Sequence, residues 1–279
     1  MTSVLIYTET GLDIGLGHVT RMLHLAHALQ EAGADVGSWP HRPTAATGWM
    51  YRRGIPMGPS SAAIGVIDVM NWDNRMVDAL RSAVDKLVVV VGAGQDEYGE
   101  TANLTVYQTG WKVPTDWPSL SGPAHLILGP EYARQSDVPR NRDALVVFGA
   151  AVPWSYSVGV AACLSGGRLA GTLVVPPYHA HEFGHTKLPP GFDMICEPWS
   201  LRELQASHCV QVGSVGMSLY EAAAMGCYPI VVGRSEDHVR TGLRLHELGY
   251  CACVGLQAAT SEGEIASGAI SELAFLRHE

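Results

Sequence analysis

A histidine near the start of the chain stands where a glycine-rich stretch gives way to a helical pattern. His18 follows Gly15 and Gly17 within the segment 11–21, and apolar residues then recur at helical spacing until Gly33. Glycines allow the backbone to turn tightly beside a ligand, and the N-terminus of a helix favours a neutral imidazole, the form that a general base requires. The segment therefore predicts a catalytic base at His18, and the alternative is a plain turn with an exposed histidine.

A carboxylate that could orient this base follows the strand-like run 64–67. Asp68 ends that run, so in a parallel sheet it would lie with the loops that carry function, where it could hold His18 or bind acceptor hydroxyls. Asp13 and Asp73 are rival candidates for this role, and a helix-capping aspartate is the structural alternative. We assign the predicted catalytic pair to His18 and Asp68.

A second glycine-rich loop, residues 212–226, combines several features of a phosphate site. Gly213, Ser214 and Gly216 are small residues at a helix start, where free backbone N–H groups and the helix dipole favour a phosphate. Glu221 falls about one helical turn further in, and a carboxylate there can accept hydrogen bonds from both hydroxyls of a ribose. The loop predicts a diphosphate and ribose site, and the alternative is a glycine turn that packs the helix on its strand.

Basic and aromatic side chains gather in a stretch that holds no acidic residue between Asp35 and Asp68. They are His41, Arg42, Trp49, Tyr51, Arg52 and Arg53. Such a cluster can grip a phosphorylated acceptor or stack an exposed base, and the alternative is a solvated loop whose side-chain stems pack on the surface. A second stretch without acidic residues, between Asp143 and Glu182, suits an anionic donor. The predicted acceptor-binding residues are Asp13, Arg42, Trp49, Arg52 and Arg53.

The segment 181–185 has the HExxH spacing of zinc peptidases, in which two histidines and a general base share one helical face. Proline pairs at 176–177 and 189–190 bracket the segment and Gly184 lies inside it, so a long amphipathic helix is not expected. We predict a loop over the donor site and no metal ligands here. A zinc site is the alternative.

The composition excludes several classes of protein. Hydrophobic residues make up 47% and charged residues 16% of the 279 residues, which excludes a disordered chain. A net charge of -9 argues against broad coating of a nucleic acid or an anionic membrane. No apolar run approaches the roughly 18 residues of a membrane helix, and residues 1–8 lack the basic start of a secretory signal, so we expect a cytoplasmic protein without integral membrane contact. The six cysteines show no CxxC spacing and are expected to be free thiols.

Short β-rich runs alternate with helical patterns from end to end, which predicts an α/β protein with parallel sheets. The expected strands are 4–7, 63–69, 87–91, 104–107, 144–149, 173–175, 194–196, 209–212 and 228–232, and the expected helices after the first are 76–85, 154–164, 217–225, 238–248 and 264–277. The polar stretch 129–143 predicts an interdomain linker. We therefore expect an N-terminal domain at 1–135 and a C-terminal domain at 136–279.

Two motifs resemble a group of GT-B proteins. Residues 15–23 resemble the GxGHVxRxL opening of this group, and residues 213–226 resemble its second-domain signature GxGGxxxYEAxxxG. Residues 145–149 also resemble the strand that opens the second domain. The group includes the UDP-sugar hydrolase of pseudaminic acid synthesis and is related to the N-acetylglucosaminyltransferase of peptidoglycan synthesis. The resemblance implies a GT-B fold, in which two Rossmann-like domains with parallel sheets face a central cleft and bind a nucleotide sugar.

The resemblance also implies roles for individual residues. His18 would be the catalytic base or water activator, the stretch 214–218 would hold the diphosphate, and Glu221 would hold the ribose. Residues 196–199 resemble the stretch whose backbone reads the nucleobase, and residues 234–238 lie where such enzymes contact the donor sugar, commonly through a glutamine that is a histidine here. The predicted donor-binding residues are Gly17, Gly149, Trp199, Gly213, Ser214, Val215, Gly216, Met217, Ser218, Glu221, Arg234, Asp237 and His238.

Two positions depart from the pattern of the group. Ala150 and Val215 stand where glycines are usual, which bears on the hydrolase assignment more than on the nucleotide site. We predict a glycosyltransferase that moves a sugar from a UDP-linked donor to an acceptor hydroxyl, with inversion and without an obligatory metal ion or other cofactor. The acceptor is expected to be a small molecule, a lipid-linked sugar or a hydroxylated base in DNA. The alternatives are hydrolysis of the UDP-sugar and a non-catalytic nucleotide-sugar-binding protein.

Overall fold

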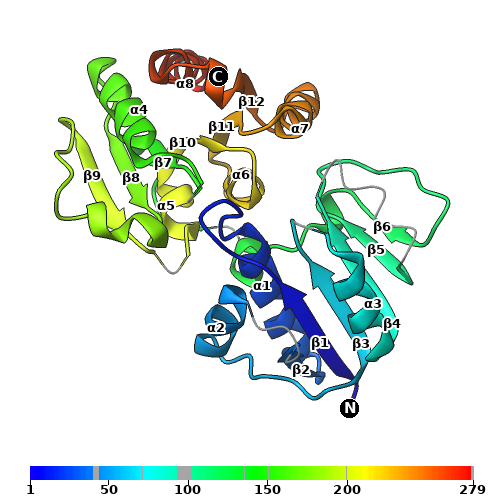
Figure 1. Ribbon diagram of the computed structural model, residues 1–279. Helices are drawn as coiled ribbons and strands as arrows, with labels where there is room; N and C mark the ends of the chain where they lie inside the picture. Colours follow the sequence, from blue (N-terminus) through cyan, green and yellow to red (C-terminus); the bar gives the residue numbers. More distant parts are fainter. Residues whose placement is uncertain are drawn as a thin grey trace. The chain divides into compact units, whose positions relative to one another are not determined.

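Two compact units make up the chain, Met1–Pro130 and Glu131–Glu279. This computed structural model describes residues 1–39, 44–70, 72–92, 102–134, 136–149, 151–198 and 200–277. In those ranges each unit holds a six-stranded sheet whose strands pair in parallel (Figure 1). The predicted α/β class with two Rossmann-like units is confirmed. The predicted boundary after residue 135 lies a few residues beyond the start of the second unit.

In the first unit the strands β1 (Ser3–Thr8) and β3 (Ala62–Asp68) are neighbours, as Figure 1 shows. The sheet order is β2-β1-β3-β4-β5-β6, with β2 at Asp35–Ser38, β4 at Val84–Val91, β5 at Leu104–Tyr107 and β6 at Ser119–Leu120. The described helices are α1 (Gly17–Glu31), α2 (Ala45–Arg52) and α3 (Asn74–Ser82), with a 3-10 turn, η2, at Pro123–His125.

Alternate residues of β1 contribute to two cores on opposite faces of the sheet. Val4 and Ile6 pack in the cluster that contains α1, and Leu5 and Tyr7 pack in the cluster that contains α3. Because helices cover both faces, the strand is apolar at every one of these positions. The buried residues of α1 recur at helical spacing and are Val19, Arg21, Met22, Leu23 and Ala26.

The second unit has the sheet order β12-β11-β10-β7-β8-β9. Its strands are β7 (Arg142–Val147), β8 (Gly171–Val175), β9 (Phe192–Cys196), β10 (His208–Ser214), β11 (Tyr228–Gly233) and β12 (Ala252–Leu256). The described helices are α4 (Trp154–Gly166), α5 (Arg202–Ser207), α6 (Met217–Ala224), α7 (Glu236–Glu247) and α8 (Glu262–Leu276). Three 3-10 turns accompany them, η3 (Pro130–Ala133), η4 (Pro177–Glu182) and η5 (Gln257–Ala259).

The largest core of this unit lies between the sheet and the pair α4 and α8. Val160 and Leu164 of α4 and Ile265 and Leu273 of α8 belong to one cluster with inward residues of β7, β8, β10 and β11. A smaller cluster on the other face includes Leu145 and packs against α5. All six cysteines are free, as expected. None of the described helices is long and apolar enough to span a membrane.

Several elements differ from the sequence-based expectation. The basic and aromatic stretch forms the helix α2 over residues 45–52, so the alternative of a solvated loop does not hold there. A capping box between Thr44 and Thr47 starts this helix although Gly48 weakens its pattern. The helix expected at 76–85 ends at Ser82, because Ala83 is its C-cap. The short elements β2, β6, α5 and β12 were not predicted.

Gly213, in the predicted donor loop, lies where β10 and β7 come close together. A Cβ at Gly213 would lie 2.2 Å from the Val147 carbonyl oxygen, whereas a Cβ at Gly149 would meet no atom within 4 Å. We expect Gly213→Ala to lower the free energy of unfolding by about 1–3 kcal/mol, because the strands must shift. Gly149→Ala is the matched control, with an expected change within about 0.5 kcal/mol. Urea unfolding of both variants measures the difference, and equal stabilities would contradict the close approach.

Candidate functional site

The loop between β1 and α1 is a tight turn that ends where α1 begins, at Gly17. The Gly15 N–H donates to the Gly11 carbonyl at 2.7 Å, and the buried Thr10 hydroxyl donates to the Gly15 carbonyl at 2.7 Å. Gly15 has a φ of 85°, which glycine adopts without strain. Leu16 is the N-cap and supplies no side-chain hydrogen bond. The first backbone N–H groups of α1 therefore receive no hydrogen bond from the Leu16 side chain.

His18, Arg21 and Asp68 form a hydrogen-bonded cluster, the His18 network. His18 Nδ1 lies 2.7 Å from Oδ1 of Asp68. Arg21 donates through Nε to Oδ2 and through Nη2 to Oδ1 of the same carboxylate. The parallel strands β1 and β3 are in a register that places Thr8 opposite Asp68. The carboxylate therefore lies at the C-terminal end of β1, where the chain leaves the sheet toward α1. The structure therefore brings together the two residues of the predicted catalytic pair.

The contacts indicate which ring nitrogen of His18 carries the proton. An ionised carboxylate only accepts hydrogen bonds, so the contact between Nδ1 and Asp68 requires a hydrogen on Nδ1. Arg21 Nη2 also lies 3.0 Å from Nδ1, but it donates to the carboxylate. The neutral ring then has its lone pair on Nε2, where a base needs it. The His18 side chain is 16% exposed, so the ring is not sealed from a ligand.

Asp68 is ionised although it is fully buried. Burial by itself raises the pKa of this carboxyl, but the charges of Arg21 and His18 and their hydrogen bonds outweigh burial and hold the pKa below its usual value. A carboxylate that stays ionised can stabilise the imidazolium that forms when His18 accepts a proton. Arg21 was not among the predicted site residues. Its position three residues after His18, on the same helical face, is the signal that could have identified it.

The rivals of Asp68 have other surroundings. Asp73 is the N-cap of α3, and its Oδ1 accepts from the Arg75 N–H at 3.0 Å, so the helix-capping alternative applies to it. Asp13 is exposed in the loop before α1. Neither residue contributes to the hydrogen bonds of the His18 network.

Three of the predicted acceptor residues cluster at the end of α2. The guanidinium carbons of Arg52 and Arg53 lie 5.3 and 5.8 Å from the centroid of the Trp49 ring, within range of cation–π contact. Burial, followed by the charge of Arg52, lowers the pKa of Arg53. The indole therefore already contacts two cations of its own helix end. Two other predicted contacts, Arg42 for the acceptor and Trp199 for the donor, lie outside the described residues.

The second candidate region is the loop from β10 into α6. We call residues 214–218 the α6 entry. The Val215 N–H donates to the Val232 carbonyl at 3.1 Å, which ties the α6 entry to β11. Gly216 is the N-cap, has an extended backbone with φ 175°, and supplies no side-chain hydrogen bond. The Ser214 hydroxyl oxygen is buried and has no hydrogen-bond partner in the described part of the chain. A helix start with no side chain on its cap suits an anion.

Two buried glutamines hydrogen-bond the backbone of the α6 entry. Gln205 Nε2 donates to Gln211 Oε1 at 2.9 Å, and the two side-chain amides donate to the Ser218 carbonyl at 3.2 and 3.1 Å. Both glutamines are almost fully buried. Their bonds fix the first turn of α6 against β10 and α5. Sequence reasoning missed them, although a glutamine inside the apolar run 209–212 was a visible signal.

Glu221, the predicted ribose ligand, is buried and already has a partner. The residue is 6% exposed, and Tyr132 of η3 forms a side-chain hydrogen bond with it. Burial and then the charge of Glu131 raise the pKa of Glu221 to about 7, although the Tyr132 bond acts in the opposite direction. Arg202 holds η3 in place, because its Nε donates to the Glu131 carbonyl at 2.7 Å. A ribose would have to share this carboxyl with Tyr132.

The raised pKa of Glu221 predicts a pH-dependent stability. In the unfolded chain the carboxyl ionises near its ordinary pKa of 4.5, but in the native state only near 7, so the free energy of unfolding falls as the pH rises between these values. We expect Glu221→Gln to be more stable than the native protein by about 3 kcal/mol above neutral pH and equal to it in acid. Urea unfolding across this pH range measures the difference. A constant difference between the two proteins would contradict the prediction.

The remaining predicted donor residues follow strands that neighbour β10. Arg234 comes directly after β11 and is half-buried, and burial lowers its pKa. Asp237 forms an exposed ion pair with Arg240, and His238 lies in the first turn of α7. Gly149 follows β7 and is exposed. Since β7, β10 and β11 are parallel neighbours, these residues and the α6 entry lie along one edge of the sheet.

The HExxH segment does not form the helix that a zinc peptidase needs. The 3-10 turn η4 ends at Glu182, and the chain then continues as turns. His181 Nε2 lies 3.4 Å from Glu182 Oε1 in an exposed pair. Among the described residues no three His, Cys, Asp or Glu side chains are arranged to hold a metal ion. The described geometry does not support the zinc alternative.

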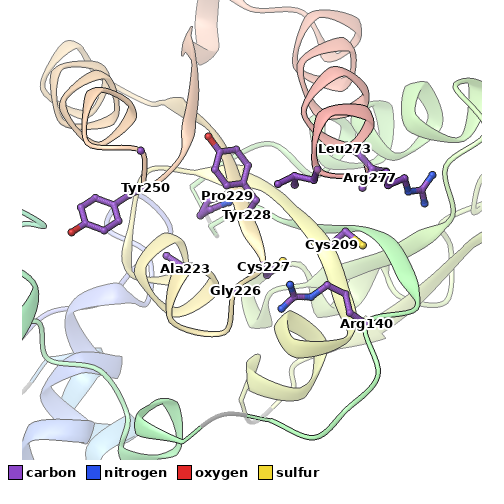
Figure 2. A pocket seen from close by; sticks show the side chains of 12 residues that line it. Arg140, Cys209, Ala223, Gly226, Cys227, Tyr228, Pro229, Tyr250, Leu273 and Arg277 are labelled. Atoms are coloured by element: carbon purple, nitrogen blue, oxygen red, sulfur yellow. The ribbon is translucent and has the colours of Figure 1, made fainter. Parts of the chain in front are cut away.

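A cavity of about 340 Å³ lies in the second unit, where β10 and β11 begin (Figure 2). Cys209 and Tyr228 from the starts of these strands line it, together with Arg140 and Tyr250. The α6 entry lies at the opposite end of β10. None of the predicted donor-binding residues that the structure describes lines this cavity, so it does not coincide with the predicted donor site.

Comparison with known proteins supports the assignment of the fold. No protein-family model matches the chain, and no curated protein sequence matches it. Solved structures do. MurG of Acinetobacter baumannii is 12% identical with a TM-score of 0.61, and the match covers 99% of this chain and 91% of that one.

Two further solved structures are named as glycosyltransferases with a bound nucleotide. The spinosyn rhamnosyltransferase SpnG, complexed with thymidine diphosphate, is 12% identical with a TM-score of 0.68, over 99% of this chain and 92% of that one. The glycosyltransferase VinC, in complex with dTDP, is 13% identical with a TM-score of 0.65, over 98% and 94%. The chain therefore has the two-domain, Rossmann-like GT-B fold of these proteins.

Proposed function

We propose that the protein is a glycosyltransferase that moves a sugar from a nucleoside diphosphate donor to an acceptor hydroxyl. The observation that carries the proposal is the His18 network, in which a buried carboxylate holds Nδ1 of an imidazole at the start of a helix. This arrangement leaves Nε2 as a base for an acceptor hydroxyl. The fold agrees with it, since the solved structures that the chain matches include glycosyltransferases.

In the proposed reaction His18 acts on the acceptor and the α6 entry acts on the donor. Nε2 removes the proton of the acceptor hydroxyl, the oxygen attacks the anomeric carbon, and the bond from that carbon to the diphosphate breaks. A single displacement inverts the anomeric centre. The leaving diphosphate gains negative charge, which the backbone N–H groups at the start of α6 would stabilise. Because these groups would supply the stabilisation, we propose that no metal ion is obligatory.

We propose UDP as the donor nucleotide, with its diphosphate at the α6 entry and its ribose at Glu221. Matched structures that contain thymidine diphosphate support a pyrimidine nucleotide. For the acceptor, the cations around Trp49 favour a phosphorylated or otherwise anionic molecule. A hydroxylated base in DNA would have to compete with Arg52 and Arg53 for the indole ring of Trp49. If DNA is the acceptor, the protein should bind DNA with an affinity that falls steeply as the salt concentration rises.

A thermal-shift screen of nucleotides and nucleotide sugars tests the proposal, because a ligand that binds only the native state raises the melting temperature. We expect UDP and one UDP-sugar to raise it. Incubation of that sugar with candidate acceptors should then consume donor only when an acceptor is present. Free sugar released without acceptor would identify a hydrolase, and binding without consumption would identify a binding protein. No shift with any nucleotide would overturn the proposal.

A further inference from the structure

Arg21 has an unusual place for an arginine in a helix, because its side chain is buried. It is 7% exposed, and it directs its side chain at the fully buried Asp68. Its two donating nitrogens reach both oxygens of that carboxylate, and Nη2 also lies 3.0 Å from His18 Nδ1. A buried arginine that contacts both members of the predicted catalytic pair acts on their shared proton as well as on their position.

We propose that Arg21 is a positioning residue that keeps the single proton of the His18–Asp68 pair on His18 Nδ1 and so keeps Nε2 free as the base. The placement of the proton is a property of the first unit by itself. Its catalytic consequence rests on the proposed function.

The pair formed by His18 and Asp68 can hold one proton or two. With one proton, the favourable state is a neutral ring with hydrogen on Nδ1 beside an ionised Asp68. With two protons, the pair is either an imidazolium beside a carboxylate or a neutral ring beside a protonated Asp68. In the second case Nδ1 must accept from the carboxyl, so the ring hydrogen moves to Nε2. In both two-proton states Nε2 carries a hydrogen and cannot act as a base.

Arg21 opposes the uptake of the second proton by the pair. Burial opposes the charge on Asp68, and the Arg21 guanidinium is the largest opposing influence that lowers the pKa of this carboxyl. The other charge that acts on Asp68 is His18 itself, and the strand opposite contributes Thr8, which does not titrate. Without the guanidinium, the pair would take up its second proton at a higher pH.

The test is nitrogen NMR of the His18 ring across a pH series, on the full chain. In the native protein we expect hydrogen on Nδ1 and none on Nε2 above neutral pH. In Arg21→Met the pH at which Nε2 gains a hydrogen should rise by about 1–3 units. Arg21→Lys keeps the charge without the planar fork and should retain most of the native behaviour. Arg75→Met removes an exposed positive charge from α3 and is the matched control, with no expected change.

Two results would overturn the inference. One is hydrogen on Nε2 in the native protein above neutral pH, a measurement that does not depend on any variant folding. The other is a folded Arg21→Met whose His18 ring titrates like the native one, which would leave Arg21 as a structural pin. Where transfer is measured, the acid side of the pH profile of kcat should move with the NMR result. The NMR result stands even if no transfer occurs, so failure of the inference and failure of the proposed function are distinguishable.

Discussion

His18→Ala is expected to lower kcat for sugar transfer by about 10²–10⁴-fold, the usual contribution of a positioned general base. The acceptor hydroxyl would then lose its proton only to solvent. The dissociation constant of the donor nucleotide should stay unchanged. The proposed diphosphate site is the α6 entry, which belongs to the second unit, whereas His18 belongs to the first. Steady-state kinetics with saturating donor and calorimetric binding of UDP measure the two quantities.

A second histidine on the same helix provides the control. His27 lies on α1, and its Nε2 is 2.9 Å from the Arg53 carbonyl, outside the His18 network. Turnover of His27→Gln should stay within about threefold of the native value, because the glutamine amide can still donate to the Arg53 carbonyl and the half-buried His27 takes no part in the His18 network. Unchanged turnover in His18→Ala would remove the proposed base. A parallel loss of UDP binding would instead indicate that the variant is misfolded.

The strands and helices with continuous apolar patterns were predictable from the sequence. The run 4–7 is buried on both faces of its sheet, and such strands carry no polar residue to obscure them. The helix α2 was missed because Gly48 and Thr47 lower its helical propensity, while the capping box that starts it depends on local geometry. The strand β2 was missed because its sequence, DVGS, holds a single β-branched residue and no apolar run, whereas β5, of the same length, has the β-rich sequence LTVY.

Site residues were predictable where they directly follow a strand, because ligands of parallel sheets bind at the carboxyl ends of the strands. Asp68 followed from its place at the end of a buried strand, and the pairing of β1 with β3 brings it to His18. Partners that are distant in sequence left no comparable pattern. Tyr132 bonds Glu221 across 89 residues, and nothing in the sequence around either residue marks that contact. Arg21 was not predicted as a site residue, because burial of an arginine becomes visible only once its partner is known.

Gly216→Asp is expected to weaken UDP binding by about 100-fold relative to Gly216→Asn. The N-cap of α6 has extended backbone with φ 175°, and a Cβ at Gly216 would meet no atom within 4 Å, so either side chain fits. Both residues are favourable N-caps and should raise the stability of the free protein by a few tenths of a kcal/mol. Only aspartate adds a negative charge where the diphosphate would lie. Two like charges in contact repel each other by about 4 kcal/mol at the effective dielectric constant of a protein surface.

This pair separates loss of the site from loss of the fold, because stability and binding change in opposite directions in the aspartate variant. Thermal unfolding without ligand should place both variants at or slightly above the native melting temperature. Calorimetry with UDP should find the loss in the aspartate variant and a much smaller one in the asparagine variant, whose neutral side chain blocks N–H groups without repelling the ligand. High salt should narrow the difference, since the repulsion is screened. Equal UDP affinity in the two variants would mean that the diphosphate does not bind at the start of α6, and the donor site would then have to be sought elsewhere in the second unit.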